Sequence, residues 1–549
     1  MTVGQEIKSF LDGLKEPRVV QQECLMRKVV QPNTECEFGR AHNFGSIRTP
    51  AEYQRAVPRV DYEDVRSFVD RMTCGEQGVL VTEPVRRFFL TSGSTAEPKY
   101  IPVTGSFIRD KVRAFSIYWG LIFQQRPGVR RGKIVTNFAD CGSTSSTVGG
   151  IACSSESAFW GAWEAKLRTG RRSLLPKEVA TISDSDCRLY AIARLLMEQA
   201  DLSVIMTLNP STIVLLLKKI DDCVDDLIED VRRGGLLKTV DVPKAFREYL
   251  ETTLPGNQER AEGLRSVVRP NGPRLLAADV WPQLELVICW RSPMLQPYHR
   301  LLEAHLRSVS GRDYITMASE GIIAIPLEDN TSGGVLATNT HFYEFIPEEQ
   351  AEQPNPDVLL AHELEVDRSY VLLLSTSSGL YRYDIGDVVR VTGFEAATPI
   401  VEFLYRVGAT CSLTGEKLTE EQVVQAFEAA ASHLEITADW FTLFPANEPL
   451  PHYVILVEPA SGGNDRGVSS LGLEVDRQLA RCNTEYRAKR DSQRLAPPEV
   501  WIAAPGSYAS WHQSRIDDGA NDGQIKPIHL TRDSRFGDRF RILERCDAS

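Results

Sequence analysis

The chain has 549 residues, of which 42% are hydrophobic and 25% are charged, which is the balance of an ordinary globular protein and excludes extensive disorder. Because this length exceeds what one hydrophobic core usually supports, we expect two domains, or one large and one small. The net charge of -12 argues against a nucleic-acid partner, since such proteins gather lysine and arginine on a basic face.

The N-terminus and the cysteines bear on the cellular compartment. Apolar residues recur at helical spacing from Val3 to Leu14, which predicts an amphipathic helix packed on the core rather than a signal peptide. No apolar run approaches the roughly 18 residues that a membrane span needs. The eleven cysteines are scattered and never spaced as Cys-x-x-Cys, a usage that favours a reducing cytoplasm and argues against a cysteine-bound metal.

After a mainly helical start, the segment 78–90 ends in a short apolar run, Phe88-Phe89-Leu90, that leads into a small-hydroxyl loop. This loop contains Thr91, Ser92, Gly93, Ser94 and Thr95 and ends at Lys99. Glycine permits positive φ, the hydroxyls and amides donate hydrogen bonds, and the lysine adds positive charge, which together suit the phosphates of ATP. The Walker A pattern is absent, so an ordinary kinase or ATPase loop has no support. A polar turn that leaves a strand remains the alternative.

The middle of the chain alternates strand-like and helical segments. Strands are predicted at the start of 133–151 and at 284–290, 321–326 and 370–375, and helices at 298–308, after Asn209-Pro210-Ser211, and as two or three surface helices over 218–265. Such alternation favours an α/β architecture in which loops at strand ends build the site. The acidic, proline-bearing segment 348–356 is expected to be an exposed loop.

The character of the sequence changes near Arg406, where we place the domain boundary. This division gives a large domain over residues 1–406 and a small α+β domain over residues 407–549. In the second domain, Thr419-Glu420-Glu421-Gln422 has the capping-box spacing of a helix start. The glycine-bearing segment 461–464 predicts an exposed loop.

Four further motifs follow the loop in a fixed order. They are Thr316-Met317-Ala318-Ser319-Glu320, Tyr381-Arg382-Tyr383-Asp384-Ile385-Gly386-Asp387, Gly415-Glu416-Lys417 and Gln524-Ile525-Lys526-Pro527. Together with the loop they resemble the adenylate-forming enzymes, and more closely the GH3 acyl acid amido synthetases. The strings at 57–64, 342–347 and 379–394 support this resemblance, which extends from about residue 36 to about residue 530. It implies a large N-terminal domain of β-sheets flanked by helices and a mobile C-terminal domain.

The resemblance implies a role for each motif in activating a carboxylic acid with ATP. The loop residues and Lys99 would hold the phosphates, with Ser319 also at the nucleotide. Glu320 would hold Mg²⁺, a hard cation that takes carboxylate, water and phosphate oxygens. Asp387 would accept hydrogen bonds from the ribose hydroxyls. Without the family match, a surface glutamate and a turn aspartate would be the simpler readings of these two residues.

Three basic residues near or beyond the boundary complete the implied site. Lys526 would reach the α-phosphate and the carboxylate during adenylation, and Lys417 would contact the nucleotide. Arg406 lies at the hinge about which the C-terminal domain would rotate between the two steps, and would contact the ribose or the phosphates. Lysines near a terminus or in a loop are usually solvated, and this remains the alternative for both lysines.

Several positions depart from the family pattern. The loop is one residue shorter and has Ala96 where glycine is common, and Thr316 stands where relatives usually have tyrosine. The segment 290–294 replaces a smaller one, and Asp384 replaces a common basic residue. The identity of the acid can therefore not be copied from the plant enzymes.

The predicted function is a cytoplasmic ligase that uses ATP and Mg²⁺. A carboxylic acid and ATP give an acyl-adenylate and pyrophosphate, and an amine or amino acid then displaces AMP to form an amide. One alternative is a thioester ligase that uses coenzyme A or a carrier protein, and another is an inactive nucleotide-binding relative. No nucleic-acid or membrane partner is expected, and the oligomeric state stays open.

Neither the acyl pocket nor the general base is marked by a motif. The aromatic residues that either line an apolar pocket or belong to the core are Phe115, Tyr118, Trp119, Phe159, Trp160 and Trp163. None of the nine histidines stands in a motif that would assign it as the base for the amine.

Overall fold

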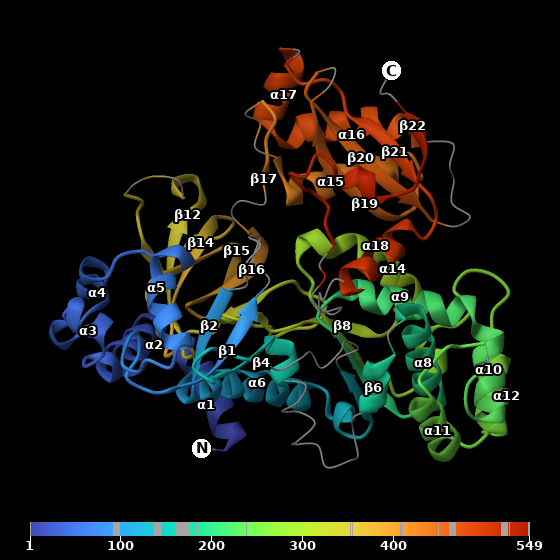
Figure 1. Ribbon diagram of the computed structural model, residues 1–549, viewed down its shortest axis with the longest axis horizontal. Helices are drawn as coiled ribbons and strands as arrows, with labels where there is room; N and C mark the ends of the chain where they lie inside the picture. The colour runs from blue at the N-terminus through green and yellow to red at the C-terminus, as the bar shows by residue number, and fades with distance from the viewer. Residues whose placement is uncertain are drawn as a thin grey trace. The chain divides into compact units, whose positions relative to one another are not determined.

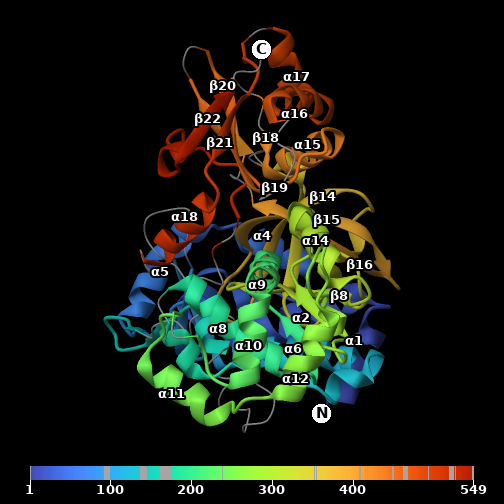
Figure 2. The same ribbon diagram turned by 90° about the vertical axis from the view of Figure 1, so that its right-hand side faces the viewer.

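The computed structural model divides into two compact units, residues 1–403 and 404–549. It describes residues 2–546 apart from residues 92–98, 137–144, 161–174, 183, 238, 352, 354, 407–409, 415, 417, 448, 449, 461–467, 493, 518–524 and 526. Both units are mixtures of helices and strands (Figures 1 and 2), as the sequence predicts. The cysteines among these residues are free thiols. None of the described helices has the length and hydropathy needed to cross a membrane.

The first unit begins with helices that have well-defined starts. They are α1 (Val3–Gly13), α2 (Pro17–Cys24), α3 (Glu37–Ala41), α4 (Pro50–Ala56) and α5 (Tyr62–Thr73). Capping boxes at Thr2, Thr49 and Asp61 satisfy the first free amides of α1, α4 and α5. The predicted amphipathic helix at the N-terminus is confirmed, because α1 buries Ile7 and Phe10 in a core that it shares with α6 (Gly105–Gln125).

A small sheet carries the predicted phosphate loop. Its strand order is β2-β1-β5-β4, with β1 (Val85–Thr91), β2 (Lys99–Thr104), β4 (Ser145–Ser146) and β5 (Ala152–Ser154). β1 and β2 are antiparallel, and β5 runs parallel to β1. α6 follows β2 directly, and the side chain of its N-cap, Thr104, accepts a hydrogen bond from the Phe107 amide.

A parallel sheet with strand order β3-β6-β7-β8 forms the centre of residues 133–313. Its strands are β3 (Lys133–Thr136), β6 (Leu202–Met206), β7 (Leu286–Cys289) and β8 (Ser310–Asp313). Alternate residues face opposite cores: Ile134 packs in the core that contains α6, and Val135 packs against the later helices. Both faces are therefore covered, which explains why the inner strands are almost wholly apolar.

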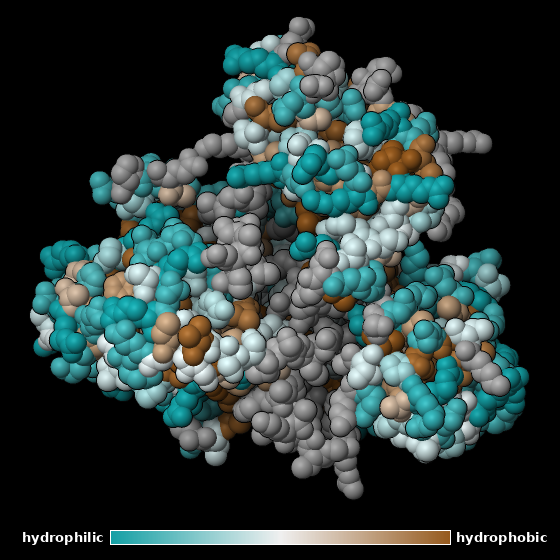
Figure 3. Space-filling model, viewed as in Figure 1, coloured by the Kyte–Doolittle hydropathy of each residue, from teal (hydrophilic) through white to brown (hydrophobic). Residues whose placement is uncertain are grey.

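The helices of this region lie together beside the parallel sheet (Figures 1 and 2). They are α8 (Ser185–Glu198), α9 (Pro210–Asp222), α10 (Val224–Arg233), α11 (Lys244–Thr253), α12 (Gln258–Val267), α13 (Ala277–Val280) and α14 (Gln296–Leu306). The predicted start of α9 is confirmed, with Asn209 as N-cap and Pro210 in the first turn. The predicted surface helices are α10 to α12, and they present mostly hydrophilic residues on the face seen in Figure 3.

The remainder of the first unit is a long, mainly antiparallel sheet with strand order β13-β12-β14-β15-β16-β11-β10-β9. Its strands are β9 (Thr316–Ala318), β10 (Gly321–Ile325), β11 (Gly334–Leu336), β12 (Phe342–Pro347), β13 (Leu359–Leu360), β14 (Ser369–Ser375), β15 (Tyr383–Glu395) and β16 (Thr398–Arg406). The predicted strands at 321–326 and 370–375 are confirmed as β10 and β14. The segment expected to be an exposed loop contains a short 3-10 turn, Glu348–Gln350.

The second unit has a sheet with strand order β19-β20-β21-β22 and a short pair, β17-β18. Its elements are β17 (Thr410–Cys411), β18 (Leu418–Thr419), α15 (Glu420–His433), β19 (Ala438–Ala446), β20 (His452–Pro459), α16 (Val468–Cys482), α17 (Thr484–Asp491), β21 (Glu499–Ala503), α18 (Ser507–Asp517) and β22 (Ile542–Cys546). The predicted capping box is confirmed, with Thr419 and Gln422 at the start of α15. The loop predicted at 461–464 lies outside the described residues.

Candidate active site

The predicted phosphate loop is the connection between β1 and β2. Thr91 and Lys99 lie opposite each other at its base, and Ser92, Gly93, Ser94 and Thr95 lie outside the described residues. The Lys99 ammonium nitrogen is 5.3 Å from the centroid of the Tyr62 ring, a cation–π arrangement. The Tyr62 hydroxyl accepts a hydrogen bond from the Tyr100 amide at 2.8 Å. The start of α5 therefore orients the lysine at the loop's base.

The same segment joins the loop to the motif at 381–387. Val60 forms a β-bridge with Tyr383, and its carbonyl accepts a hydrogen bond from the Asp384 amide at 2.8 Å. Val60 and Tyr62 are only two positions apart, so residues 60–62 link Lys99 to the strand that carries Asp387. The structure thus brings together two motifs that are nearly 300 residues apart.

Asp387, predicted to bind the ribose, lies on β15 with 7% of its surface exposed. The residue before it, Gly386, has a φ of +75°, which side-chain-bearing residues rarely adopt. One carboxylate oxygen of Asp384 accepts a hydrogen bond from the Gly386 amide at 2.8 Å, and the other pairs with Arg59 at 2.5 Å. Asp384, the departure from the family pattern, therefore shapes the backbone just before Asp387.

Removing this support is expected to weaken nucleotide binding. Arg59→Met and Asp384→Asn should each raise the KM for ATP several-fold, because the irregular part of β15 that presents Asp387 loses an ion pair. The two effects should not add in the double variant, since both changes remove the same interaction. Steady-state kinetics of the two single variants and the double variant measure the coupling, and full additivity would show that Arg59 and Asp384 act separately.

Glu320, predicted to bind Mg²⁺, lies in the turn between β9 and β10. Ala318 and Gly321 are paired across these strands, so Ser319 and Glu320 form the two-residue connection. Glu320 is only 4% exposed, which makes the simpler reading as a surface glutamate wrong. A side chain at Gly321 would come within 3.0 Å of two atoms of the His341 ring, which explains the glycine.

Two residues of the site were missed by the sequence interpretation. Lys111 on α6 and Glu156, just after β5, form a buried ion pair at 2.5 Å. The Lys111 ammonium also donates to the Ala318 carbonyl at 2.9 Å, next to the Glu320 turn. Burial lowers the pKa of Lys111, and the charges of Glu156 and Glu320 oppose that shift. The sequence signal for Lys111 was its spacing: apolar residues stand three and four positions before it and after it, so it shares an apolar face of the helix.

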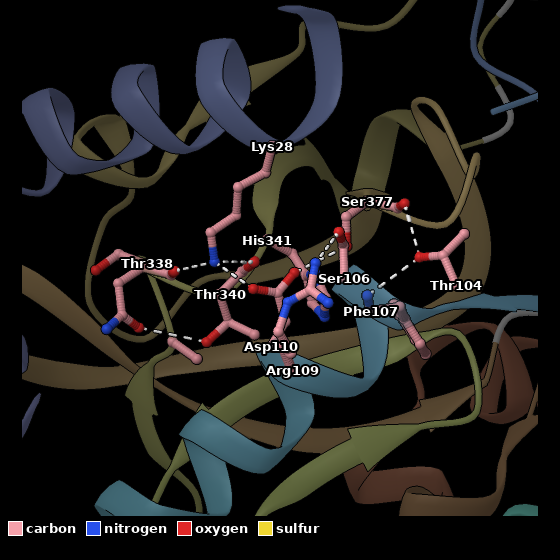
Figure 4. A network of polar contacts seen from close by, with 12 residues as sticks. Lys28, Thr104, Ser106, Phe107, Arg109, Asp110, Thr338, Thr340, His341 and Ser377 are labelled. Atoms are coloured by element: carbon pink, nitrogen blue, oxygen red, sulfur yellow. Dashed lines mark hydrogen bonds and ion pairs between the residues drawn. The ribbon is translucent and has the colours of Figure 1, made fainter. Parts of the chain in front are cut away.

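The N-terminal end of α6 is fastened to the segment before the 381–387 motif (Figure 4). The Thr104 hydroxyl donates to the Ser377 carbonyl at 3.2 Å, and the Ser377 hydroxyl donates to Asp110 at 2.8 Å. Asp110 also pairs with Lys28 at 2.5 Å. A side chain at Gly379, whose φ is +91°, would come within 2.8 Å of Leu80. α6 thus supports both the loop and the later motif.

Among the aromatic residues predicted to line a pocket or belong to the core, Tyr118 belongs to the core, and Trp160 forms a cluster with Phe159 and Phe115. Tyr118 is completely buried and donates to the Asp313 carbonyl, so it belongs to the core. Trp160 is half-buried, and its ring centroid lies 5.0 Å from that of Phe159 and 5.6 Å from that of Phe115. Its indole N–H donates to Glu156 at 2.9 Å. Trp163 lies outside the described residues.

The basic residues predicted from the later motifs lie at the boundary between the two units or beyond it. Arg406 is exposed at the end of β16. Lys417 and Lys526 lie outside the described residues. The carboxylate of Glu416, beside Lys417, accepts hydrogen bonds from the Leu413 and Thr414 amides at 2.7 and 2.8 Å.

The described residues include the kinds of side chain that binding of ATP and Mg²⁺ requires. Among them, no group of three or more His, Cys, Asp or Glu side chains could hold a metal ion alone. Mg²⁺ at nucleotide sites is instead bound by one or two carboxylates together with phosphates and water, which suits the buried carboxylate of Glu320. Lys111 links the turn that carries Glu320 to β1, the strand before the phosphate loop, because its ammonium donates to the Ala318 carbonyl and lies 5.6 Å from the ring centroid of Phe89.

Relatives of this chain are found over its whole length. It is 26% identical over 540 residues to a jasmonoyl–L-amino acid synthetase, GH3.5, of Oryza sativa subsp. japonica, covering 92% of this chain and 90% of that protein. It is 24% identical over 577 residues to the indole-3-acetic acid-amido synthetase GH3.4 of Arabidopsis thaliana (97% and 94% covered). It is 23% identical over 572 residues to the 4-substituted benzoates-glutamate ligase GH3.12 of Arabidopsis thaliana (99% and 97% covered).

A solved structure has the same fold. The AtGH3.15 acyl acid amido synthetase in complex with 2,4-DB superposes with a TM-score of 0.86 at 20% identity, covering 100% of this chain and 98% of that one. Models of the GH3 family match in three consecutive stretches: the N-terminal domain at residues 6–310, the central domain at 334–406 and the C-terminal domain at 421–535. The chain therefore belongs to the GH3 family.

Proposed function

We propose that this protein is an ATP-dependent acyl acid amido synthetase. In the first step a carboxylate oxygen attacks the α-phosphorus of ATP, the bond to the bridging oxygen breaks, and pyrophosphate leaves. In the second step the nitrogen of an amine or amino acid attacks the acyl carbonyl, AMP leaves, and the amine loses a proton. This proposal rests on the positions of Lys99, Glu320 and Asp387, which the family's motifs mark. The three residues lie on connected elements of one unit.

Each of these residues has a defined task in the proposed first step. Lys99 stands at the base of the loop, where its positive charge would offset that of the phosphates. Asp387, whose carboxylate is an acceptor on the irregular part of β15, would orient the ribose. Mg²⁺, held by Glu320, would supply positive charge at the phosphates. Because the adenylate is already an activated carboxyl group, the protein needs positioning and electrostatics rather than a nucleophile of its own.

The second unit would supply the remaining groups. We assign adenylation to Lys526, and contacts with the nucleotide to Arg406 and Lys417, on the family resemblance of their motifs. The proposed acceptor is an amine or amino acid because the named relatives are a jasmonoyl–L-amino acid synthetase, an indole-3-acetic acid-amido synthetase and a 4-substituted benzoates-glutamate ligase. A cytoplasmic setting, which supplies ATP and keeps the scattered thiols reduced, is part of this proposal.

ATP–pyrophosphate exchange with a panel of aromatic and aliphatic acids tests the first step. We expect exchange that depends on the acid and on Mg²⁺, and that falls strongly in Lys526→Ala. Exchange that is unchanged in Lys526→Ala would refute the role assigned to that lysine. Complete absence of exchange and of AMP release would favour an inactive relative.

The acceptor is tested by offering amino acids, other amines and coenzyme A together with each active acid. Mass spectrometry of the products should find amides. A thioester as the main product would contradict amide formation while leaving the adenylation step intact.

A further inference from the structure

The ion pair of Lys111 and Glu156 is buried at a place that apolar side chains would ordinarily fill. Lys111 has no exposed surface, and Glu156 is 7% exposed. Removing two charges from water costs several kcal/mol per ion, and an apolar pair of similar volume is often at least as stable. Stability of the core alone therefore explains this pair poorly.

The contacts of Lys111 are directed at the turn that carries Glu320. Besides Glu156, its ammonium lies 2.9 Å from the Ala318 carbonyl oxygen and 3.5 Å from the Ser319 carbonyl oxygen. An ammonium has three donors and no acceptor, so these three oxygens match its capacity. The two carbonyls belong to the residues immediately before Glu320, and their positions set the direction in which its side chain leaves the turn.

α6 also supports the opposite side of the same turn, through the His341 ring. Gly321 packs against the His341 ring, and that ring stacks on Phe107 of α6 with a centroid distance of 5.6 Å. Phe107 lies one helical turn before Lys111, whose ammonium is 5.1 Å from the Phe107 ring centroid. α6 therefore holds the turn by polar contacts on one side and by stacked rings on the other.

Glu156 connects this arrangement to the sheet of the phosphate loop. It follows β5, whose Ser154 pairs with Phe89 on β1. The indole of Trp160 donates to the same carboxylate oxygen that Lys111 contacts, which fixes the rotamer of Glu156. A chain of direct contacts thus runs from the strand before the loop, through Glu156 and Lys111, to the Glu320 turn.

We propose that Lys111 and Glu156 are positioning residues that hold the Ser319–Glu320 turn in a fixed place relative to β1, the strand that leads into the phosphate loop, so that Glu320 meets the Mg²⁺ of the bound nucleotide. The proposal rests on the proposed function. Groups that orient a metal ligand typically contribute about 10- to 100-fold to metal affinity or activity. Lys111→Met keeps the length of the side chain and removes its charge and its donors, and therefore tests the proposal directly.

Arg194→Met is the matched control. Arg194 on α8 is as fully buried as Lys111, pairs with the Glu198 carboxylate at 2.9 Å, and also donates to one backbone carbonyl, that of Gly235. None of these partners belongs to the Glu320 turn or to α6. In pyrophosphate exchange, the Mg²⁺ concentration for half-maximal activity should rise about 10-fold or more in Lys111→Met. It should stay unchanged in Arg194→Met, even where both variants lower the melting temperature.

A binding measurement separates metal affinity from turnover. Mn²⁺ titrated into the full-length protein with a non-hydrolysable ATP analogue, and followed by electron paramagnetic resonance, should bind about 10-fold more weakly to Lys111→Met. Unchanged Mn²⁺ affinity together with unchanged Mg²⁺ dependence would overturn the proposal and leave Lys111 a structural role. If Lys111→Met does not fold, Glu156→Gln decides: weaker Mn²⁺ binding supports the proposal, and wild-type binding overturns it.

The test also distinguishes this proposal from the proposed function. If the unmodified protein shows no exchange with any acid, the proposed reaction fails, while Mn²⁺ binding with the ATP analogue still reports on Lys111. If the unmodified protein exchanges normally and Lys111→Met has the same metal dependence, only the positioning role fails.

Discussion

Glu320→Gln is expected to lower the rate of ATP–pyrophosphate exchange by about 10²- to 10³-fold at saturating ATP, the usual cost of losing one electrostatic group at a reacting centre. The change keeps the shape of a side chain that is 4% exposed, so packing is preserved. It replaces a charged ligand of a hard cation by a neutral amide oxygen. Initial exchange rates with the best acid of the panel measure the loss.

Two variants make this result specific. Glu320→Asp keeps the charge and shortens the reach, so higher Mg²⁺ concentrations should restore part of its activity. Glu198→Gln makes the same chemical change at a carboxylate of α8 that pairs with Arg194 at 2.9 Å, and exchange should remain at the wild-type level. A loss of less than 5-fold in Glu320→Gln would show that Glu320 does not hold the metal.

Local signals in the sequence predicted the elements that the structure confirms. The capping residues Asn209 and Thr419 mark the starts of α9 and α15, because a side-chain acceptor there satisfies the first free amides. The continuous apolar runs at β7 and β14 predicted buried strands. The helix expected at 298–308 is present but displaced: α14 spans Gln296–Leu306, and it ends where Arg307 adopts a φ of +42°.

The residues that support the site could not be predicted from such signals. Lys111 and Glu156 are 45 positions apart, and Arg59 and Asp384 are 325 apart. Their pairing depends on how the sheets and helices pack. A single lysine or aspartate forms no periodic pattern in the sequence from which a distant partner could be predicted. Glu320 and Asp387 were found only because their motifs resemble a family. Lys417 and Lys526 remain predictions.

The second large effect is expected when the ion pair of Glu344 and Arg382 is broken, and it is an effect on the free energy of unfolding. Glu344 has no exposed surface, and Arg382 donates to both of its oxygens, at 3.0 and 3.1 Å. Arg382 also donates to the carbonyls of Gln54 and Val57, and its φ is +46°. The surrounding contacts therefore hold Arg382 in a backbone conformation that is costly for a non-glycine residue.

Glu344→Ala should destabilise the first unit by about 3–5 kcal/mol, because it leaves the Arg382 charge buried without its partner. A chain of two units need not unfold in one step, so amide hydrogen exchange in β12 and β15 is the suitable measurement. Glu402→Ala is the matched control in the same sheet: its partner Arg390 is 34% exposed and reaches water, so the loss should be about 1 kcal/mol.

The double variant Glu344→Leu/Arg382→Leu separates the structural role of this pair from its link to the nucleotide site. With both charges gone, much of the lost stability should return, since no ion remains buried alone. The carbonyls of Gln54 and Val57 nevertheless lose their donor, and Val57 stands three residues before Val60, whose bridge to Tyr383 joins the segment at Lys99 to the strand that carries Asp387. We therefore expect a folded double variant with a raised KM for ATP, whereas wild-type values of both stability and KM would show that the pair does not couple to the site.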